Sequence, residues 1–196
     1  MAIGTYAQLS AAITTGWPHR TDLSADDFIQ LAEAKFNRRL RTKHQELALS
    51  ETAIDASYQV AIPANTLGVK RMWRTDDPKT PLGSKTLEFV IMRQSAGALA
   101  LNYCQEDATW RFDGTGSVAG VLHRSIPALS SSNTTNWLLT QAPDLYLYAC
   151  LAQVFHYVNN VNRAMAYEAK ADQLIDELNR AEHRDQFSGP LVMRAA

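Results

Sequence analysis

Apolar residues in the first 49 positions recur at the spacing of an α-helix. The sequence Thr5-Tyr-Ala-Gln8 has the form of a capping box, so a first helix should begin there and stop before Gly16. A second candidate box, Ser24-Ala-Asp-Asp27, places two acidic residues in the first turn of another helix. The apolar stripe that follows keeps spacings of three and four: Phe28, Leu31, Ala32, Phe36 and Leu40.

Between about residues 50 and 127 the hydrophobic period changes to two. Alternation of this kind predicts half-buried strands, and four segments show it: 58–62, 67–73, 110–112 and 118–126. The second of these strands should end at Asp76-Asp77-Pro78. Residues 87–100 are a candidate for a short helix on the sheet.

From Pro143 the pattern is helical again, with proline at a favoured first position. Twelve of the fourteen residues 145–158 are apolar, so this helix must be covered on several sides, by other helices or by neighbouring subunits. Asn159-Asn160 predicts a turn, after which a last helix forms a hairpin with the preceding one. The apolar stripe of the last helix consists of Ala164, Tyr167, Ala171, Leu174 and Leu178.

Together these patterns predict a mainly α protein with a β-rich insertion, which is an α+β fold. Residues 1–49 and 128–182 should form one helical bundle, and residues 50–127 a small inserted β subdomain. Residues 183–196 mix charges with Ser188-Gly189-Pro190 and are interpreted as an extended C-terminal tail. We expect this tail to become ordered on contact with a partner.

Length and charge narrow the class of protein. A chain of 196 residues allows one compact domain, or one body with an insertion. Its 19 Lys and Arg residues nearly balance 20 Asp and Glu residues. This balance excludes a protein that binds nucleic acid or anionic membrane through a large net positive charge. No signal peptide and no membrane-spanning segment are expected. Cys104 and Cys150 lie far apart and are interpreted as buried thiols.

Motifs that carry chemistry are scarce. The five histidines, at positions 19, 44, 123, 156 and 183, have no metal-ligand spacing, so we expect no metal site. Gly114-Thr-Gly116 resembles part of a phosphate loop but lacks the Gly-Lys-Ser/Thr end, which favours a turn between strands. The serines at 130–132 lack the strained elbow that exposes a nucleophile.

Pairs of acidic residues are the remaining candidates for catalysis. Glu51 with Asp55, or Glu106 with Asp107, would supply the carboxylates of a glycan hydrolase if an apolar pocket raised the pKa of one of them. Among 20 acidic residues such neighbours are expected by chance, so a solvated surface is the favoured interpretation.

A basic run consists of Lys35, Arg38, Arg39, Arg41 and Lys43, with no acid between Glu33 and Glu46. At helical spacing its first three members share one face. The favoured interpretation is a solvated helix face, and the alternative is contact with an acidic partner surface or with phosphate.

Three segments in this order resemble the hallmark stretch of the head-to-tail adaptor (connector) proteins of short-tailed, podovirus-type bacteriophages: Ile126-Pro-Ala-Leu129, Asn136-Trp-Leu-Leu139 and Ala142-Pro-Asp-Leu-Tyr-Leu-Tyr148. The opening Thr5-Tyr-Ala-Gln-Leu9 and residues 28–40 are similar to that family too. These landmarks extend from about residue 5 to residue 180.

The resemblance implies a structural virion protein without enzymatic activity and without a cofactor. Such a protein is made in the host bacterial cytoplasm and forms a homo-oligomeric ring of about twelve copies at the head-to-tail interface. The ring would dock under the portal protein, link the capsid to the tail nozzle protein and continue the channel through which double-stranded DNA passes, with no membrane partner. The resemblance gives the C-terminal tail a role in docking on the portal, with these candidates: Phe187, Leu191, Val192 and Met193.

Candidate subunit contacts are the amphipathic aromatics Trp137, Tyr146, Tyr148 and Phe155, although core packing is an equal alternative. A DNA conduit must let DNA slide, so the basic run should face the portal, another subunit or solvent. Two rival functions stay open. One is a virion-associated cell-wall glycan hydrolase that uses the acidic pairs, and the other is a DNA-binding module that uses the basic helix.

Overall fold

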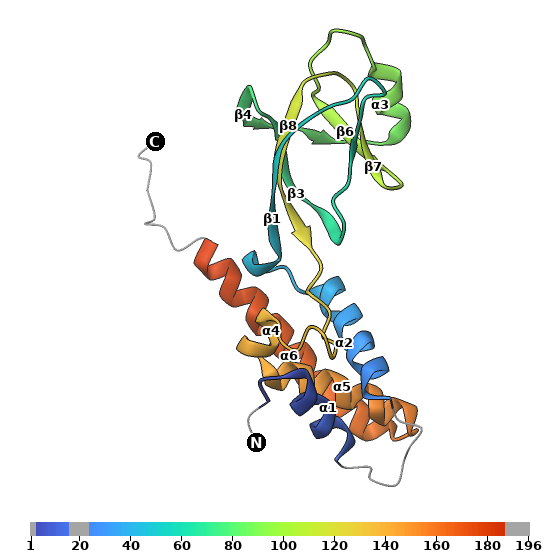
Figure 1. Cartoon of the computed structure of the whole chain (residues 1–196), viewed down its shortest axis with the longest axis vertical. Helices are drawn as coiled ribbons and strands as arrows, with labels where there is room; N and C mark the ends of the chain where they lie inside the picture. Colours follow the sequence, from blue (N-terminus) through green and yellow to red (C-terminus); the bar gives the residue numbers. More distant parts are fainter. Residues whose placement is uncertain (1–2, 16–23, 187–196) are drawn as a thin grey trace, which may run out of the picture. The chain divides into compact units, whose positions relative to one another are not determined.

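The computed structural model describes residues 3–15 and 24–186. It divides into two compact units: a helical unit from residues 1–44 and 126–196, and a β unit from residues 45–125. The fold is α+β, as predicted, and the described part of the chain contains six α-helices and two sheets (Figure 1).

Helix α1 (Tyr6–Thr14) begins at the predicted capping box. The Thr5 hydroxyl accepts a hydrogen bond from the Gln8 N–H at 3.4 Å. The Gln8 side chain accepts from the Gly4 N–H at 2.8 Å instead of returning to Thr5. Two of the backbone groups at this helix end are therefore satisfied by neighbouring side chains.

Helix α2 (Ala25–Arg39) begins at the second predicted box, where the Ser24 hydroxyl accepts a backbone N–H at 3.4 Å. The predicted apolar stripe is wrong at Leu31, which is 51% exposed. Ile29 and Glu33 are buried instead. At 3.6 residues per turn, positions 29 and 33 lie on the same buried face of the helix as Ala25 and Phe36. Residue 31 lies two positions from each of them and therefore points to the opposite side.

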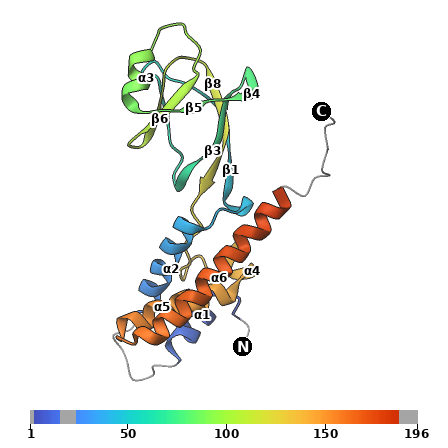
Figure 2. The same ribbon diagram turned by 180° about the vertical axis from the view of Figure 1, so that it is seen from behind.

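Helices α5 (Pro143–Tyr157) and α6 (Val161–Gln186) form the predicted hairpin (Figure 2). Asn159 adopts a left-handed conformation with φ 57°, which asparagine tolerates better than most residues. The Asn160 N–H donates to the Phe155 carbonyl at 2.9 Å and closes a Schellman motif. The Asn160 side chain then accepts an N–H of the first turn of α6 at 3.3 Å. One asparagine ends a helix and the next begins another.

Helix α5 lies at the centre of the helical unit and contacts α1, α2, α4 (Trp137–Gln141) and α6. The sequence predicted that other helices or neighbouring subunits would cover this apolar helix, and helices of the same chain bury most of it. Its buried residues are Leu145, Tyr146, Ala149, Cys150, Ala152, Val154 and Phe155.

The β unit consists of two four-stranded sheets, in the orders β1-β8-β3-β4 and β2-β7-β6-β5. All neighbouring strands are antiparallel except β5 and β6. Side chains from both sheets form one core around Trp110, Phe112 and Leu122. The strands are Glu46–Ala53 (β1), Gln59–Ala61 (β2), Thr66–Arg74 (β3), Asp77–Pro81 (β4), Gly83–Ser84 (β5), Asn102–Glu106 (β6), Thr109–Phe112 (β7) and Ser117–Arg124 (β8).

The four predicted strands are confirmed as β2, β3, β7 and β8, and the short helix as α3 (Leu87–Arg93). The second predicted strand ends just before Asp76-Asp77-Pro78, as expected, since β3 ends at Arg74. A further strand, β4, which the pattern did not predict, begins at Asp77 and contains Pro78 and Pro81. As an edge strand of its sheet, β4 tolerates residues that cannot donate a hydrogen bond. Gly114-Thr-Gly116 forms the predicted turn, between β7 and β8.

Two predicted boundaries and the thiols can now be placed. Residues 46–49, expected in the first helical segment, are the start of strand β1. Residues 183–186, expected in the tail, continue helix α6.

Cys104 and Cys150 are both buried and free, as predicted, and burial raises the pKa of each thiol.

Candidate functional site

Helix α6 is longer than the helix with which it pairs. It has 26 residues and α5 has 15, which corresponds to about 39 Å and 22 Å of helix at 1.5 Å per residue. Because the two helices run back from the turn at Asn159, the part of α6 beyond about Ile175 has no α5 beside it. The apolar stripe continues past this point with Leu178 and Ala181. The last turns of α6 therefore present apolar side chains that α5 does not cover.

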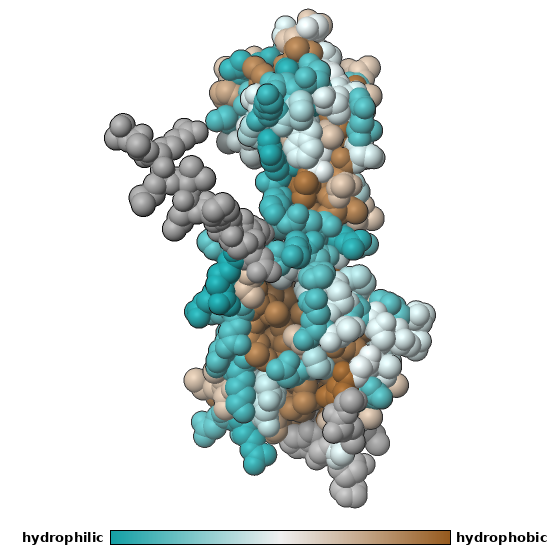
Figure 3. Space-filling model, turned by 90° about the vertical axis from the view of Figure 1, so that its left-hand side faces the viewer, coloured by the Kyte–Doolittle hydropathy of each residue, from teal (hydrophilic) through white to brown (hydrophobic). Residues whose placement is uncertain are grey.

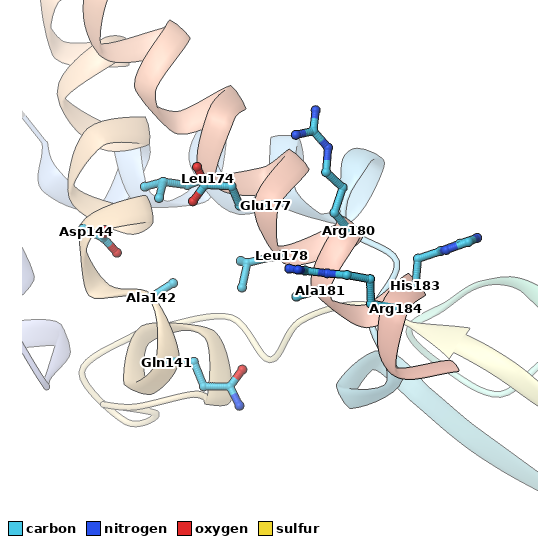
Figure 4. Close-up of a pocket in the computed structure, with 10 residues that line it drawn as sticks. All are labelled: Gln141, Ala142, Asp144, Leu174, Glu177, Leu178, Arg180, Ala181, His183 and Arg184. Atoms are coloured by element: carbon cyan, nitrogen blue, oxygen red, sulfur yellow. The ribbon is translucent and has the colours of Figure 1, made fainter. Parts of the chain in front are cut away.

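A groove of about 940 Å³ lies at this place, between the C-terminal half of α6 and the junction of α4 with α5 (Figure 4). Leu174 and Leu178 point toward the junction, and Arg180 points away from it. Figure 3 shows apolar side chains gathered between hydrophilic ones on the helical unit. The groove is lined by Gln141, Ala142, Asp144, Leu174, Glu177, Leu178, Arg180, Ala181, His183 and Arg184.

The junction that forms one wall of the groove is fixed by local sequence. The Asn136 side chain accepts a backbone N–H of α4 at 2.8 Å and caps that helix. Ala142 ends α4 and directly precedes Pro143, which has no N–H to lose at the first position of α5. Asp144 follows in the first turn, where its Oδ1 accepts the Leu145 N–H at 3.0 Å. An acidic side chain is thus held at the edge of an apolar groove.

Trp137, a predicted subunit contact, lies beside this wall in a half-buried position. Its ring stacks on His44 with 5.0 Å between ring centres and 18° between planes. The Nε2 atom of His44 lies 3.1 Å from Nε2 of Gln141, which lines the groove. Trp137 is therefore held in place by residues of its own helical unit.

Tyr148 and Phe155, two further predicted contacts, lie along the α5–α6 hairpin around Tyr167. The Phe155 and Tyr167 rings stack with 5.4 Å between centres and 1° between planes, and Tyr148 lies 5.9 Å from Tyr167. The Lys170 ammonium is 5.3 Å from the Tyr148 ring centre. Phe155 is only 6% exposed, so Tyr148 carries most of the surface that another molecule could contact.

Tyr146 is fully buried within the subunit, which favours the core-packing alternative over a subunit contact. Its hydroxyl donates to Glu33 Oε1 at 3.1 Å and accepts from the Asn136 amide at 2.7 Å. The same Glu33 oxygen accepts the Leu129 N–H at 2.8 Å. Burial raises the pKa of the Glu33 carboxyl, and its two hydrogen bonds oppose this rise. No pattern of residues around position 33 indicates a buried acid.

The basic run does not form one solvated face. Helix α2 ends at Arg39, so Arg41 and Lys43 lie outside it. The Lys35 ammonium lies 2.6 Å from Asp172 Oδ1 and 3.1 Å from Glu168 Oε1, both on α6. Arg39 lies 2.7 Å from Asp172 and 3.6 Å from Asp176. The acidic surface that meets these two basic residues belongs to the same chain, whereas Arg38 is exposed.

The predicted carboxylate pairs do not form a hydrolase site. Glu51 and Asp55 are exposed, and Asp55 accepts the Ser57 and Gln59 N–H groups at 2.8 and 2.7 Å in a turn. Glu106 pairs with Arg111 on the neighbouring strand. Asp107 is exposed in a turn. Three of these acids are exposed and Glu106 is only partly buried, whereas a general acid needs an apolar pocket around it.

Residues 3–15 and 24–186 contain no cluster of three or more His, Cys, Asp or Glu side chains that could hold a metal ion. Within the same residues, none of the helices combines the length and apolar character that crossing a membrane requires. The predicted portal-docking residues Phe187, Leu191, Val192 and Met193 lie outside the part of the chain that the structure describes.

The site is thus a groove with apolar side chains and a charged rim, next to aromatic side chains, and its lining is suited to contact with a segment of another protein. Comparison with protein families agrees, since the profile of the SU10 adaptor protein family matches residues 4–194. The chain belongs to this family of phage structural adaptor proteins, which are virion components. No curated protein matches the chain.

Proposed function

We propose that this adaptor is a head-to-tail connector of the short-tailed type. Copies of the chain form a ring, with about twelve subunits, that docks under the portal protein and links the capsid to the tail nozzle protein. The ring continues the channel through which the genome leaves. Residues 1–44 and 126–186 supply the helical unit of the subunit, residues 45–125 form the β-rich insertion, and the residues that follow α6 contact the portal.

The observation that carries this proposal is the groove at the end of α6. Its volume of about 940 Å³ and its apolar wall residues Leu174, Leu178 and Ala181 are suited to a segment of another protein. The predicted docking residues of the tail begin one position after α6 ends. A groove and an apolar tail at the same end of one helix give a subunit two means of contacting its neighbours.

The pairing of the basic residues supports a channel through which DNA can slide. Lys35 and Arg39 are already neutralised by Glu168, Asp172 and Asp176 of the same chain. A lumen lined by unpaired basic residues from every copy would bind many phosphates and hold the genome. We therefore propose that the lumen is neutral to acidic and that Arg38, Arg41 and Lys43 face the portal, another subunit or solvent.

Mass measurement of the purified full chain, alone and with the portal protein of the same phage, tests the proposal. The expected mass is that of a ring bound to the portal. A chain that stays monomeric and does not bind the portal protein would overturn the proposal. A chain ending at residue 186 should lose portal binding if the tail docks as proposed. A full-length variant tests whether the side chains or only the length of the tail account for binding. It replaces by alanine the residues Phe187, Leu191, Val192 and Met193, and it should lose binding to a similar extent.

A further inference from the structure

Helix α3 of the β unit carries an apolar surface that its own unit leaves uncovered. Five of its seven residues are apolar, but Val90 alone among them is buried. The exposed fractions are 38% for Leu87 and Phe89, 48% for Ile91 and 80% for Met92. A helix that is apolar on most sides is normally covered on most sides, and the described residues 3–15 and 24–186 leave four apolar residues of α3 exposed.

This surface is held in a fixed place. Val90 is fully buried, and α3 contacts strands β6 and β7. The Thr86 hydroxyl caps the helix by accepting the Phe89 N–H at 3.4 Å. Beyond its other end, the Gln94 side chain donates to the Phe112 carbonyl at 3.1 Å. A rigid apolar surface of this kind loses little conformational entropy when a partner covers it.

Charged residues flank the apolar surface of α3. The Lys85 ammonium and the Arg93 guanidinium lie 5.7 and 5.6 Å from the centre of the Phe89 ring. Glu88 is exposed on the same helix. The Arg93 guanidinium also lies 3.9 Å from Oδ2 of the buried Asp113, so the surface combines apolar side chains with two cations, one of them already paired, and one acid.

The groove on the helical unit matches this surface in size and in charge. Seven residues of α3 span about 10 Å, and the part of α6 from Leu174 to Arg184 spans about 15 Å. Only the exposed side of α3 would enter the groove, which has a volume of about 940 Å³ and is longer along α6 than α3 itself. Asp144 and Glu177 can oppose the two cations of α3, and Arg184, whose side chain points toward Leu178, can oppose its acid (Figure 4).

We propose that α3 of one copy docks in the groove of the next copy. The inference rests on the proposed ring and names the contact that builds it. Because the two surfaces differ, each bound copy still has a free α3 at one side and a free groove at the other. Such a head-to-tail contact propagates until a circle closes, as a ring requires.

Disulfide trapping between two different molecules tests this contact directly. Met92→Cys and Leu178→Cys are placed in separate full-length chains, which are mixed, assembled with the portal protein and oxidised. A covalent dimer is expected in the mixture and in neither variant alone. The native cysteines are both buried, so they give little background. The matched control pairs Leu178→Cys with Leu67→Cys, an exposed leucine of the same β unit, and should give no dimer.

The outcomes separate this inference from the proposed function. A portal-bound ring of the right mass without a 92–178 cross-link overturns the α3 contact and leaves the ring standing. A bond that forms only when both cysteines are in one chain also overturns it, because α3 then occupies its own groove. Absence of any ring overturns the proposed function itself.

A second variant tests the contact without new cysteines. Met92→Glu should weaken ring assembly roughly tenfold or more, because it places a charge in the apolar groove. Met92 is mostly exposed in the single chain, so the subunit should fold normally. Leu67→Glu is the matched control and should assemble like the wild type. Equal assembly of the two variants would contradict the inference.

Discussion

The Tyr146 hydroxyl donates a hydrogen bond of 3.1 Å to Glu33, and both residues are buried in the helical unit. This pair joins α5 to α2. The Leu129 N–H adds a second bond to the same carboxylate oxygen, and the Asn136 amide adds one to the phenol. The segment that leads from the β unit into α4 is thereby fixed to the helices, and the wall of the groove begins where this segment ends.

We expect Tyr146→Phe to lower the free energy of unfolding by about 1–3 kcal/mol, because it leaves a buried donor of Asn136 and a lone pair of Glu33 unpaired. Urea denaturation of the full chain measures this change. Tyr148→Phe is the matched control on the same helix. It keeps its ring contacts with Tyr167 and Lys170, and should change the free energy by less than about 0.5 kcal/mol. Equal effects of the two substitutions would show that the network contributes nothing.

Glu33→Gln should change how stability depends on pH. Burial raises the pKa of Glu33, so the folded chain binds this proton more tightly than the unfolded chain does. The stability contributed in this way is complete below the ordinary glutamate pKa of about 4.3, and it is lost as pH rises through the folded value. Unfolding free energies of both proteins between pH 4 and 7 measure the effect. The wild type should lose more stability than the variant over this range, and parallel curves would contradict the assignment.

Local signals in the sequence predicted the elements that depend on local contacts. Thr5 and Ser24 cap their helices as expected, and the Asn159-Asn160 pair both ends α5 and begins α6. Strands β2, β3, β7 and β8 follow the alternating pattern. Strand β4 was missed because Pro78 is tolerated at an edge, and edge position is a property of the whole sheet.

The candidate site was harder to predict, because it depends on how distant segments pack. The apolar stripe of α6 was predicted through Leu178, but nothing in the sequence placed α4 opposite it. For Tyr146 the sequence leaves an interface and core packing as equal alternatives, because an amphipathic aromatic looks the same whether its hydroxyl meets water or Glu33. Lys35 and Arg39 were assigned to a solvated face since their acidic partners lie more than 130 positions away.

Gly114→Ala should destabilise the β unit strongly. A Cβ atom at this position would lie 2.5 Å from the Ala98 carbonyl oxygen and 2.7 Å from the Ala100 nitrogen, and backbone atoms cannot easily move aside. We expect a loss of more than about 2 kcal/mol in the free energy of unfolding. Denaturation monitored by tryptophan fluorescence, to which the buried Trp110 of the β unit contributes, measures this loss. Gly68→Ala is the matched control, since nothing lies within 4 Å of its added atom. A similar loss in both variants would contradict the steric explanation.

Lys35→Met tests whether the basic run is engaged within the subunit. The hydrogen bond from Lys35 lowers the pKa of Glu168. Burial alone would raise the pKa of Asp172, but the hydrogen bonds from Lys35 and Arg39 bring that pKa below its usual value. Stability from these acids is present above their unfolded pKa values of about 4, and it is lost as pH falls through the lower folded values. Both acids are about a third or more exposed, so the expected loss at pH 7 is only about 1 kcal/mol.

The pH dependence of that loss separates an ion-pair network from simple packing. The difference between wild type and Lys35→Met should shrink below about pH 4, because protonated acids no longer attract the ammonium. Arg38→Met is the matched control on the same helix, exposed and outside the pairs, and should cost less than about 0.5 kcal/mol at any pH. A constant difference from pH 7 down to pH 3 would mean that pairing with ionised Glu168 and Asp172 does not account for the loss. The basic residues of α2 would then be available to bind an acidic partner or phosphate after all.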